Sequence, residues 1–148
     1  MSLMTLLLAF LHLSQPASHV AVVVSASAAS AARGSKVSLY IDVTPNSGVH
    51  VYAPGAKDYV PIVVKMDPQS NLTFAELTYP KSEVMEFAGD KVPVYEKAFR
   101  LVEDVEIGRG AKAGKTLTLT ANVKYQACDD RVCFIPATVP VRWTISVK

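Results

Sequence analysis

Apolar and polar residues alternate along most of the chain from residue 19 onward. The alternating runs are rich in β-branched residues and are interrupted at short intervals by Gly, Pro, Asn and Asp, a pattern typical of strands joined by turns. It predicts an all-β sandwich in which each strand presents its apolar face to a shared core. The expected strands are residues 19–27, 36–44, 48–53, 60–66, 73–79, 94–102, 116–127 and 133–147, the last interrupted near Pro136 and Pro140.

Residues 81–91 are the least strand-like stretch in the middle of the chain. The segment is polar, carries charges of both signs and ends near Ala88-Gly89. We therefore expect a loop here, which the apolar side chains of Val84, Met85 and Phe87 attach to the core.

The first 18 residues precede the predicted sandwich, which spans residues 19–148 as one domain. Residues 3–13 are mostly apolar, but they are too few to cross a bilayer, which needs about 20 residues. The length suits the apolar part of a secretory signal peptide, although no positive charge precedes it. The alternative is an N-terminal helix whose apolar face packs on the sandwich or on a second copy of the chain.

Composition is that of a folded globular domain. Half of the 148 residues are apolar, 19% are charged, and the formal net charge is +2. The basic residues are scattered singly instead of lying in runs, so there is no electrostatic argument for binding nucleic acid. No glycine-rich phosphate loop or nucleophile elbow is present, and neither a small-molecule cofactor nor hydrolytic catalysis is expected.

The two cysteines, Cys128 and Cys133, are separated by four residues and bracket a predicted hairpin loop. Opposed positions on antiparallel strands have Cα atoms about 4.5 to 5.5 Å apart, a separation that a disulfide tolerates. Closing so short a loop stabilises a protein by roughly 2 kcal/mol, against nearly 5 kcal/mol for a loop of about 100 residues. The spacing is therefore compatible with a local structural disulfide or with a redox-active pair.

Two other cysteine chemistries are disfavoured. The histidines His12, His19 and His50 have no ligand spacing to the cysteines, so we expect no metal site. A thioredoxin-type site requires two residues between its cysteines, and this pair has four.

Residues 125–136, with the sequence YQACDDRVCFIP, resemble the signature of the N-terminal domain of the DsbD thiol:disulfide interchange proteins. Residues 48–54 are similar to a strand of that family, and residues 86–89 are similar to its cap loop. The resemblance covers roughly residues 20–148. It implies an immunoglobulin-like β-sandwich in the periplasm, or otherwise outside the cytoplasm, that acts as a thiol:disulfide oxidoreductase.

The resemblance also implies partners and roles. The domain would pass electrons between a membrane electron-transfer protein or thioredoxin-like redox proteins and periplasmic oxidoreductases. Cys133 would exchange with partners and Cys128 would resolve the mixed disulfide. Phe87 would shield the disulfide, and the remaining site residues would surround it; these are Glu86, His50, Tyr52, Tyr125, Asp129, Asp130 and Arg131. Met85 departs from the family, which commonly has an acidic residue there.

The charged triplet between the cysteines admits two interpretations. Asp129 and Asp130 disfavour a thiolate nearby and Arg131 partly opposes them, which predicts a slow dithiol that reacts when a partner opens the cap. The triplet is equally typical of an ordinary solvated hairpin tip.

Two other functions compete with electron relay. One is a non-catalytic secreted binding module whose hairpin disulfide stiffens a contact loop. The other is an accessory of copper or cytochrome maturation that keeps a partner's thiols reduced. Reduction potential would separate a structural disulfide from an exchanging one.

Overall fold

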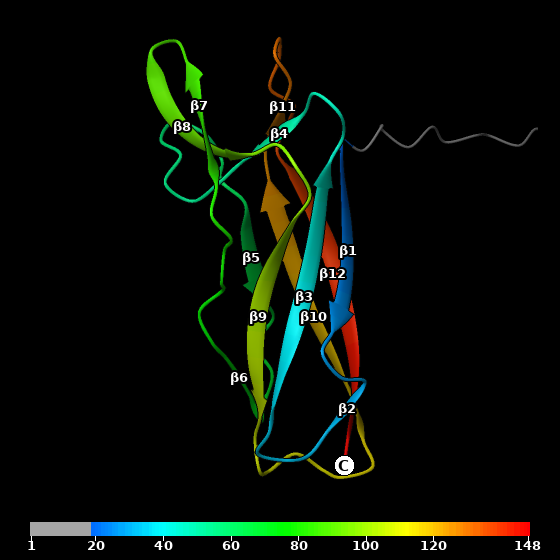
Figure 1. Cartoon of the computed structure of the whole chain (residues 1–148). Helices are drawn as coiled ribbons and strands as arrows, with labels where there is room; N and C mark the ends of the chain where they lie inside the picture. The colour runs from blue at the N-terminus through cyan, green and yellow to red at the C-terminus, as the bar shows by residue number, and fades with distance from the viewer. Residues whose placement is uncertain (1–18) are drawn as a thin grey trace, which may run out of the picture.

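The computed structural model describes residues 19–148, which fold into an immunoglobulin-like β-sandwich with a smaller third sheet at one end (Figure 1). The prediction for the fold class is confirmed. The expectations for residues 1–18 lie outside the described residues. The strands are β1 (Val20–Ala26), β2 (Ser30–Ala31), β3 (Lys36–Pro45), β4 (His50–Tyr52), β5 (Val63–Met66), β6 (Leu72–Phe74), β7 (Glu83–Phe87), β8 (Asp90–Tyr95), β9 (Phe99–Ile107), β10 (Thr116–Tyr125), β11 (Ala127–Cys128) and β12 (Ala137–Val147).

The two large sheets enclose the main core. One has the strand order β1-β3-β9-β6 and the other β2-β12-β10-β5. In the central strands every second residue is buried, because successive side chains of a strand point to opposite faces. The inward apolar residues are Val37, Leu39, Ile41 and Val43 of β3, Leu101, Val105 and Ile107 of β9, Leu119, Ala121 and Val123 of β10, and Trp143, Ile145 and Val147 of β12.

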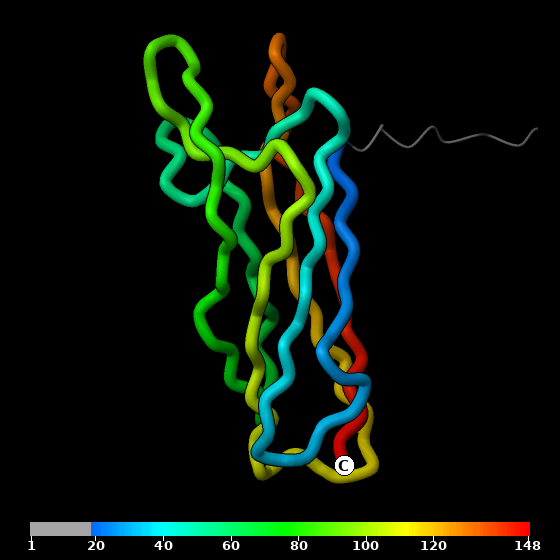
Figure 2. Tube along the Cα trace, in the orientation of Figure 1, coloured from blue at the N-terminus to red at the C-terminus, as the bar shows by residue number. Residues whose placement is uncertain are grey.

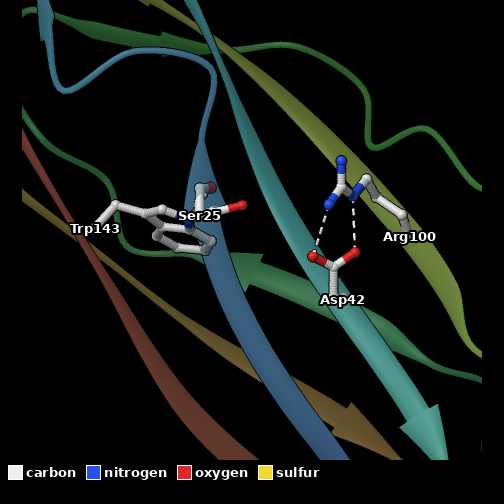
Figure 3. Close-up of polar contacts among 4 residues, drawn as sticks. All are labelled: Ser25, Asp42, Arg100 and Trp143. Atoms are coloured by element: carbon white, nitrogen blue, oxygen red, sulfur yellow. Dashed lines mark hydrogen bonds and ion pairs between the residues drawn. The ribbon is translucent and has the colours of Figure 1, made fainter.

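A tryptophan links the two large sheets, and an ion pair links two strands of one of them (Figure 3). The indole N–H of Trp143 in β12 donates a hydrogen bond of 2.9 Å to the backbone oxygen of Ser25 in β1. On the solvent side, both guanidinium contacts of Arg100 reach the carboxylate of Asp42, at 2.7 and 2.8 Å, across the β3–β9 pair. Trp143 is 4% exposed, so its hydrogen bond is shielded from water and stabilises the packing of the two sheets. The exposed Asp42–Arg100 ion pair contributes little to the free energy of unfolding.

The third sheet has the order β11-β4-β8-β7 and lies at the end of the sandwich opposite the C-terminus (Figure 2). Two hairpins project there: the β7–β8 hairpin and the cysteine hairpin that follows β11. The end of the molecule that carries the cysteines is thus built from segments distant in sequence. Residues 19–148 contain no helix that could cross a membrane.

The loop predicted for residues 81–91 is wrong: the segment forms the β7–β8 hairpin. Its turn is Ala88-Gly89, with φ angles of 51° and 86°, which is the left-handed backbone of a two-residue hairpin turn. The periodicity gave no sign of a strand because β7 is an edge strand with four of its five residues exposed. We call residues 83–95 the cap hairpin.

Other predicted boundaries also need correction. The single strand expected over residues 94–102 is divided into β8 and β9, which belong to different sheets, and the stack of Tyr95 on Phe99 at 4.0 Å bridges the change of direction. Strand β12 begins at Ala137 and runs without interruption through Pro140. Pro140 is tolerated because β2 pairs with β12 only at Ser146 and Val147, so no strand lies on that side of Pro140.

Three further boundaries differ at the ends of the sandwich. β6 (Leu72–Phe74) covers only two residues of the expected 73–79 run, although Thr78 makes an isolated bridge to Val102. Gln126 separates β10 from β11 within the expected 116–127 strand. The two-residue strand β2 was not expected, since it lies in a run of small residues without alternation.

Candidate functional site

The two cysteines form a disulfide at the base of the cysteine hairpin. Cys128 ends β11, and Cys133 faces it through an isolated antiparallel bridge with a Cα–Cα distance of 4.0 Å and an S–S bond of 2.02 Å. The expected pairing is therefore present. The two residues differ in burial, because Cys128 is 1% exposed while Cys133 lies in the exposed class. Cys133 is therefore the cysteine that is exposed on the protein surface.

Asp129 shapes the loop between the cysteines. Its Oδ1 accepts hydrogen bonds from the backbone N–H groups of Val132, at 2.7 Å, and Arg131, at 2.8 Å, which is an Asx-type turn. These two bonds lower the pKa of the Asp129 carboxyl, that from Val132 contributing most. The loop is closed further by the backbone bond from Phe134 N–H to the oxygen of Ala127, 2.9 Å long. Asp129 thus has a structural role in the turn, whereas Asp130 and Arg131 are exposed at the tip.

Tyr52 connects the cap side of the site to the exposed sulfur. Its hydroxyl lies 3.5 Å from Cys133 Sγ, and its ring stacks on Tyr59 with centroids 4.2 Å apart. Burial raises the pKa of Tyr52 to about 12, and Tyr59 contributes to the rise. The phenol therefore keeps its proton at neutral pH and can donate it to a sulfur atom.

His50 lies directly opposite Cys128 in the pairing of β4 with β11. It is 7% exposed, and the edge of its ring packs against Tyr52 at a centroid distance of 5.2 Å. Burial lowers the pKa of His50, and the carboxylates of Glu96 and Asp129 partly counteract that effect. The imidazole is thereby favoured in its neutral form, next to the buried cysteine.

The cap hairpin packs on this site through a small apolar cluster. Cys128 and Tyr52 share the cluster with Val92 and Val94 of β8, and Met85 of β7 packs against it. The cap residue that packs against Cys128 and its neighbours is thus Met85. Phe87, the residue expected to shield the disulfide, lies two positions further along and is 54% exposed. Because alternate residues of a strand share a face, Phe87 lies on the same face of β7 as Met85.

A groove of about 540 Å³ separates the cap hairpin from the cysteine hairpin. Its charged lining is mostly acidic, and Lys97 on its rim lies 3.6 Å from Glu83. The lining residues with side chains that bear on the chemistry are His50, Met85, Glu86, Phe87, Glu96, Lys97, Asp129 and Asp130. The structure therefore brings His50, Glu86, Phe87 and the two aspartates of the sequence prediction to one groove.

Of the other predicted site residues, Tyr52, Arg131 and the two cysteines do not line this groove, and Tyr125 lies in the core of the sandwich. It is 4% exposed and belongs to the core cluster of the main sandwich.

Two neighbours that the sequence did not indicate are Tyr59 and Gln126. The Gln126 side chain accepts from Val60 N–H and donates to the Phe134 oxygen, both at 3.3 Å, and so ties the hairpin base to the chain before β5. The contact between Val60 and Gln126 joins segments that are distant in sequence, so only the three-dimensional structure reveals it. Residues 19–148 show no group of three metal-ligating side chains.

The fold and the site together define a thiol–disulfide redox domain: an immunoglobulin-like sandwich with a disulfide between a buried and an exposed cysteine. The family model described as thiol:disulfide interchange protein DsbD, N-terminal, matches residues 19–143. The chain belongs to this family, and the resemblance noted in the cysteine motif is confirmed. Thiol:disulfide interchange is the general activity that the family and the disulfide support.

Solved structures share the fold at low sequence identity. The DsbD N-terminal domain of Neisseria meningitidis in the reduced form matches with a TM-score of 0.53 and 18% identity, covering 83% of each chain. The N-terminal periplasmic domain of ScsB from Proteus mirabilis has a TM-score of 0.62 and 16% identity, covering 88% of this chain and 48% of that one.

A third match is the complex between the DsbD N-terminal and PilB N-terminal domains of N. meningitidis, with a TM-score of 0.50 and 17% identity, covering 71% of this chain and 73% of that one. The chain spans about half the length of the matched ScsB chain. The search of curated proteins finds no match.

Proposed function

We propose that this protein is a thiol:disulfide oxidoreductase that relays electrons outside the cytoplasm by opening and closing the Cys128–Cys133 bond. The observation that carries the proposal is the unequal burial of the two cysteines, one exposed and one 1% exposed. A structural disulfide has no need of an accessible sulfur, whereas exchange requires one sulfur that a foreign thiol can approach.

The unequal burial assigns a role to each cysteine in the proposed cycle. In the reduced protein the Cys133 thiolate attacks a partner's disulfide, forms a mixed disulfide and displaces one partner thiolate. Cys128 then attacks Cys133 Sγ, which re-forms the internal disulfide and releases the second partner thiolate. The partner gains two electrons and this domain loses two, and the reverse sequence reloads the domain from an electron donor.

Exposed apolar side chains around the sulfur support a protein partner rather than a small thiol. Val132 and Phe87 are both 54% exposed, Val84 is 66% exposed, and Ile135, two residues after Cys133, is 90% exposed. Such residues are costly in water and typically mark a protein contact surface. They place apolar surface on both hairpins that flank the groove.

The proposed partners are thioredoxin-like redox proteins and a membrane electron-transfer protein that supplies electrons. The solved complex of a similar DsbD domain with a PilB domain supports pairing with another protein domain. The proposed location is the periplasm or another extracytoplasmic compartment, because the similar ScsB domain is periplasmic and disulfides persist in oxidising compartments.

The cap hairpin is proposed to restrict access to the disulfide until a partner docks. Met85 already covers the inner side of the pair through the cluster with Cys128, and Phe87 extends the same face toward the groove. Glu86 is exposed beside it and would meet the partner. Movement of the hairpin would be inexpensive, because few buried contacts hold an exposed edge strand.

The decisive experiment is covalent trapping with Cys128→Ser, which removes the resolving thiol and keeps the exposed one. Reduced Cys128→Ser is mixed with an oxidised thioredoxin-like protein, and the products are separated without reductant. We expect a stable mixed disulfide on Cys133, while the matched control Cys133→Ser forms none. Equal trapping by the two variants, or none by either, would contradict the proposal.

Reduction potential provides an independent test against the binding-module alternative. An exchanging pair is expected between about −120 and −270 mV, the span of known exchange proteins, whereas a structural disulfide lies below about −300 mV. Equilibration of the protein with glutathione buffers measures this value. A potential in the structural range would favour a hairpin that merely stiffens a contact loop.

A further inference from the structure

His50 and the disulfide lie on one face of the third sheet. His50 is the direct cross-strand neighbour of Cys128, and such neighbours have Cβ atoms about 4.5 to 5.5 Å apart on the same face. Cys133 pairs with Cys128 on its other side, and Tyr52, two residues after His50, reaches Cys133 Sγ at 3.5 Å. The imidazole is therefore next to the buried sulfur, and the phenol is next to the exposed one.

His50 is a buried polar residue beside the disulfide. The residue is 7% exposed, and the edge of its ring packs against Tyr52. It lines the groove between the two hairpins instead of pointing into the apolar core. A ring that lies beside the buried cysteine and also borders the groove is placed to take a proton from one and release it to the other.

We propose that His50 is the general base that takes the thiol proton of Cys128 when Cys128 resolves the mixed disulfide. This inference rests on the proposed exchange cycle. The proton of the Cys128 thiol passes to a ring nitrogen of His50, and the resulting thiolate forms a bond with Cys133 Sγ. The bond between Cys133 and the partner sulfur breaks, and that sulfur leaves as a thiolate with the electron pair. The His50 proton is then lost to water in the groove.

Burial explains why Cys128 needs such a group. The thiolate is the nucleophile, and a cysteine that is 1% exposed among apolar side chains forms a thiolate reluctantly. The exposed Cys133 can lose its proton directly to water. Assistance from a neighbouring base is therefore specific to the second step of the cycle.

The groove favours both protonation states that the cycle requires. Burial lowers the pKa of His50 and keeps the resting imidazole neutral, as a base must be. After proton transfer, the carboxylates of Glu96 and Asp129 stabilise the imidazolium. The titratable and charged residues that line the groove with it are Glu86, Glu96, Lys97, Asp129 and Asp130.

The two steps can be timed separately with the aromatic disulfide dithiobis(nitrobenzoate) as the partner. The reduced protein releases one thionitrobenzoate when Cys133 attacks, at a rate proportional to reagent concentration. It releases a second when Cys128 attacks the mixed disulfide, at a rate independent of concentration. Both absorb visibly, so stopped-flow traces at several pH values give two rate constants for each variant.

We expect His50→Gln to slow the second release about 10- to 100-fold, at the lower end of the range for a positioned general base, and to change the first less than about twofold. It should also remove the inflection that His50 gives to the pH profile of the second step. His19→Gln is the matched control, since His19 stacks on Phe134 beside the same hairpin. A second release as fast in His50→Gln as in the parent would overturn the inference.

His50→Ala separates proton transfer from packing. The groove beside this position can admit free imidazole, which should accelerate the second release in His50→Ala and leave it unchanged in the parent. A slow second release that imidazole does not accelerate would assign His50 a packing role and also overturn the inference. The proposed function fails on a different result, the absence of protein partners trapped on Cys133.

Discussion

The core of the sandwich contains one carboxylic acid, Glu103 of β9, and we predict that it makes stability fall as pH rises. Glu103 occupies an inward position between Leu101 and Val105 and is 3% exposed. Its Oε1 atom has no hydrogen-bond partner within the described residues. Burial, with a smaller contribution from the charge of Asp104, raises the pKa of Glu103 to about 7 from an ordinary 4.5.

The sign follows from which state holds the proton. Between pH 4.5 and 7 the unfolded chain ionises Glu103 while the folded protein keeps it neutral, so the unfolded state gains stability as pH rises. The contribution of Glu103 to the free energy of unfolding is therefore fully present below about pH 4.5 and is lost above about pH 7. At about 1.4 kcal/mol for each pKa unit, the loss across this window is about 3 kcal/mol.

Urea unfolding of the parent and Glu103→Gln at a series of pH values measures this effect, because glutamine has nearly the same shape and cannot ionise. We expect the stability of Glu103→Gln relative to the parent to rise by about 3 kcal/mol from about pH 4 to about pH 8. His50, whose lowered pKa makes stability fall with acid, is common to both proteins and cancels in the difference. Glu106→Gln, on the exposed face of the same strand, is the control. Parallel pH curves for Glu103→Gln and the parent would refute the reasoning.

Two further predictions concern the cap and the sandwich. Phe87→Ala should react with a small thiol a few-fold faster than the parent, whereas Val84→Ala, at a position 66% exposed on the same strand, should not; equal rates for Phe87→Ala and the parent would remove the shield. Trp143→Phe should lower the free energy of unfolding by about 0.5 to 1.5 kcal/mol, since it removes the hydrogen bond from the buried indole to the Ser25 carbonyl of β1, and should leave the reduction potential unchanged. An unaltered urea midpoint would show that the inter-sheet bond contributes nothing.

The sandwich strands were predictable because burial there has a simple period. β3 and β10 alternate between core and solvent along their whole length, and the sequence repeats that alternation. The same signal cannot report that a chain changes sheets, so it predicts one strand across residues 94–102 where β8 and β9 belong to different sheets. It also fails for β7, which is stabilised by backbone pairing with β8 rather than by a buried face.

The site was predictable only as far as it is local in sequence. The disulfide follows from two cysteines on either side of one hairpin. The arrangement of Tyr59 over Tyr52, and of His50 opposite Cys128, depends on how β4 pairs with β11 and on the turn that follows β4. Local patterns hold no information on such registers, so the resemblance could indicate His50 and Tyr52 but neither their geometry nor the presence of Tyr59.

In the proposed exchange cycle, the position of the disulfide would let its bond open and close while the domain stays folded. Closing a loop of about six residues contributes only roughly 2 kcal/mol in the chain-entropy model, and the core beneath it belongs to the two large sheets. The turn at Asp129 and the backbone bond between Phe134 and Ala127 do not involve sulfur, so we expect them to keep Cys128 and Cys133 close after reduction. The resolving thiol therefore stays at a high effective concentration beside the exchanging one, which favours rapid release of a partner over a long-lived mixed disulfide.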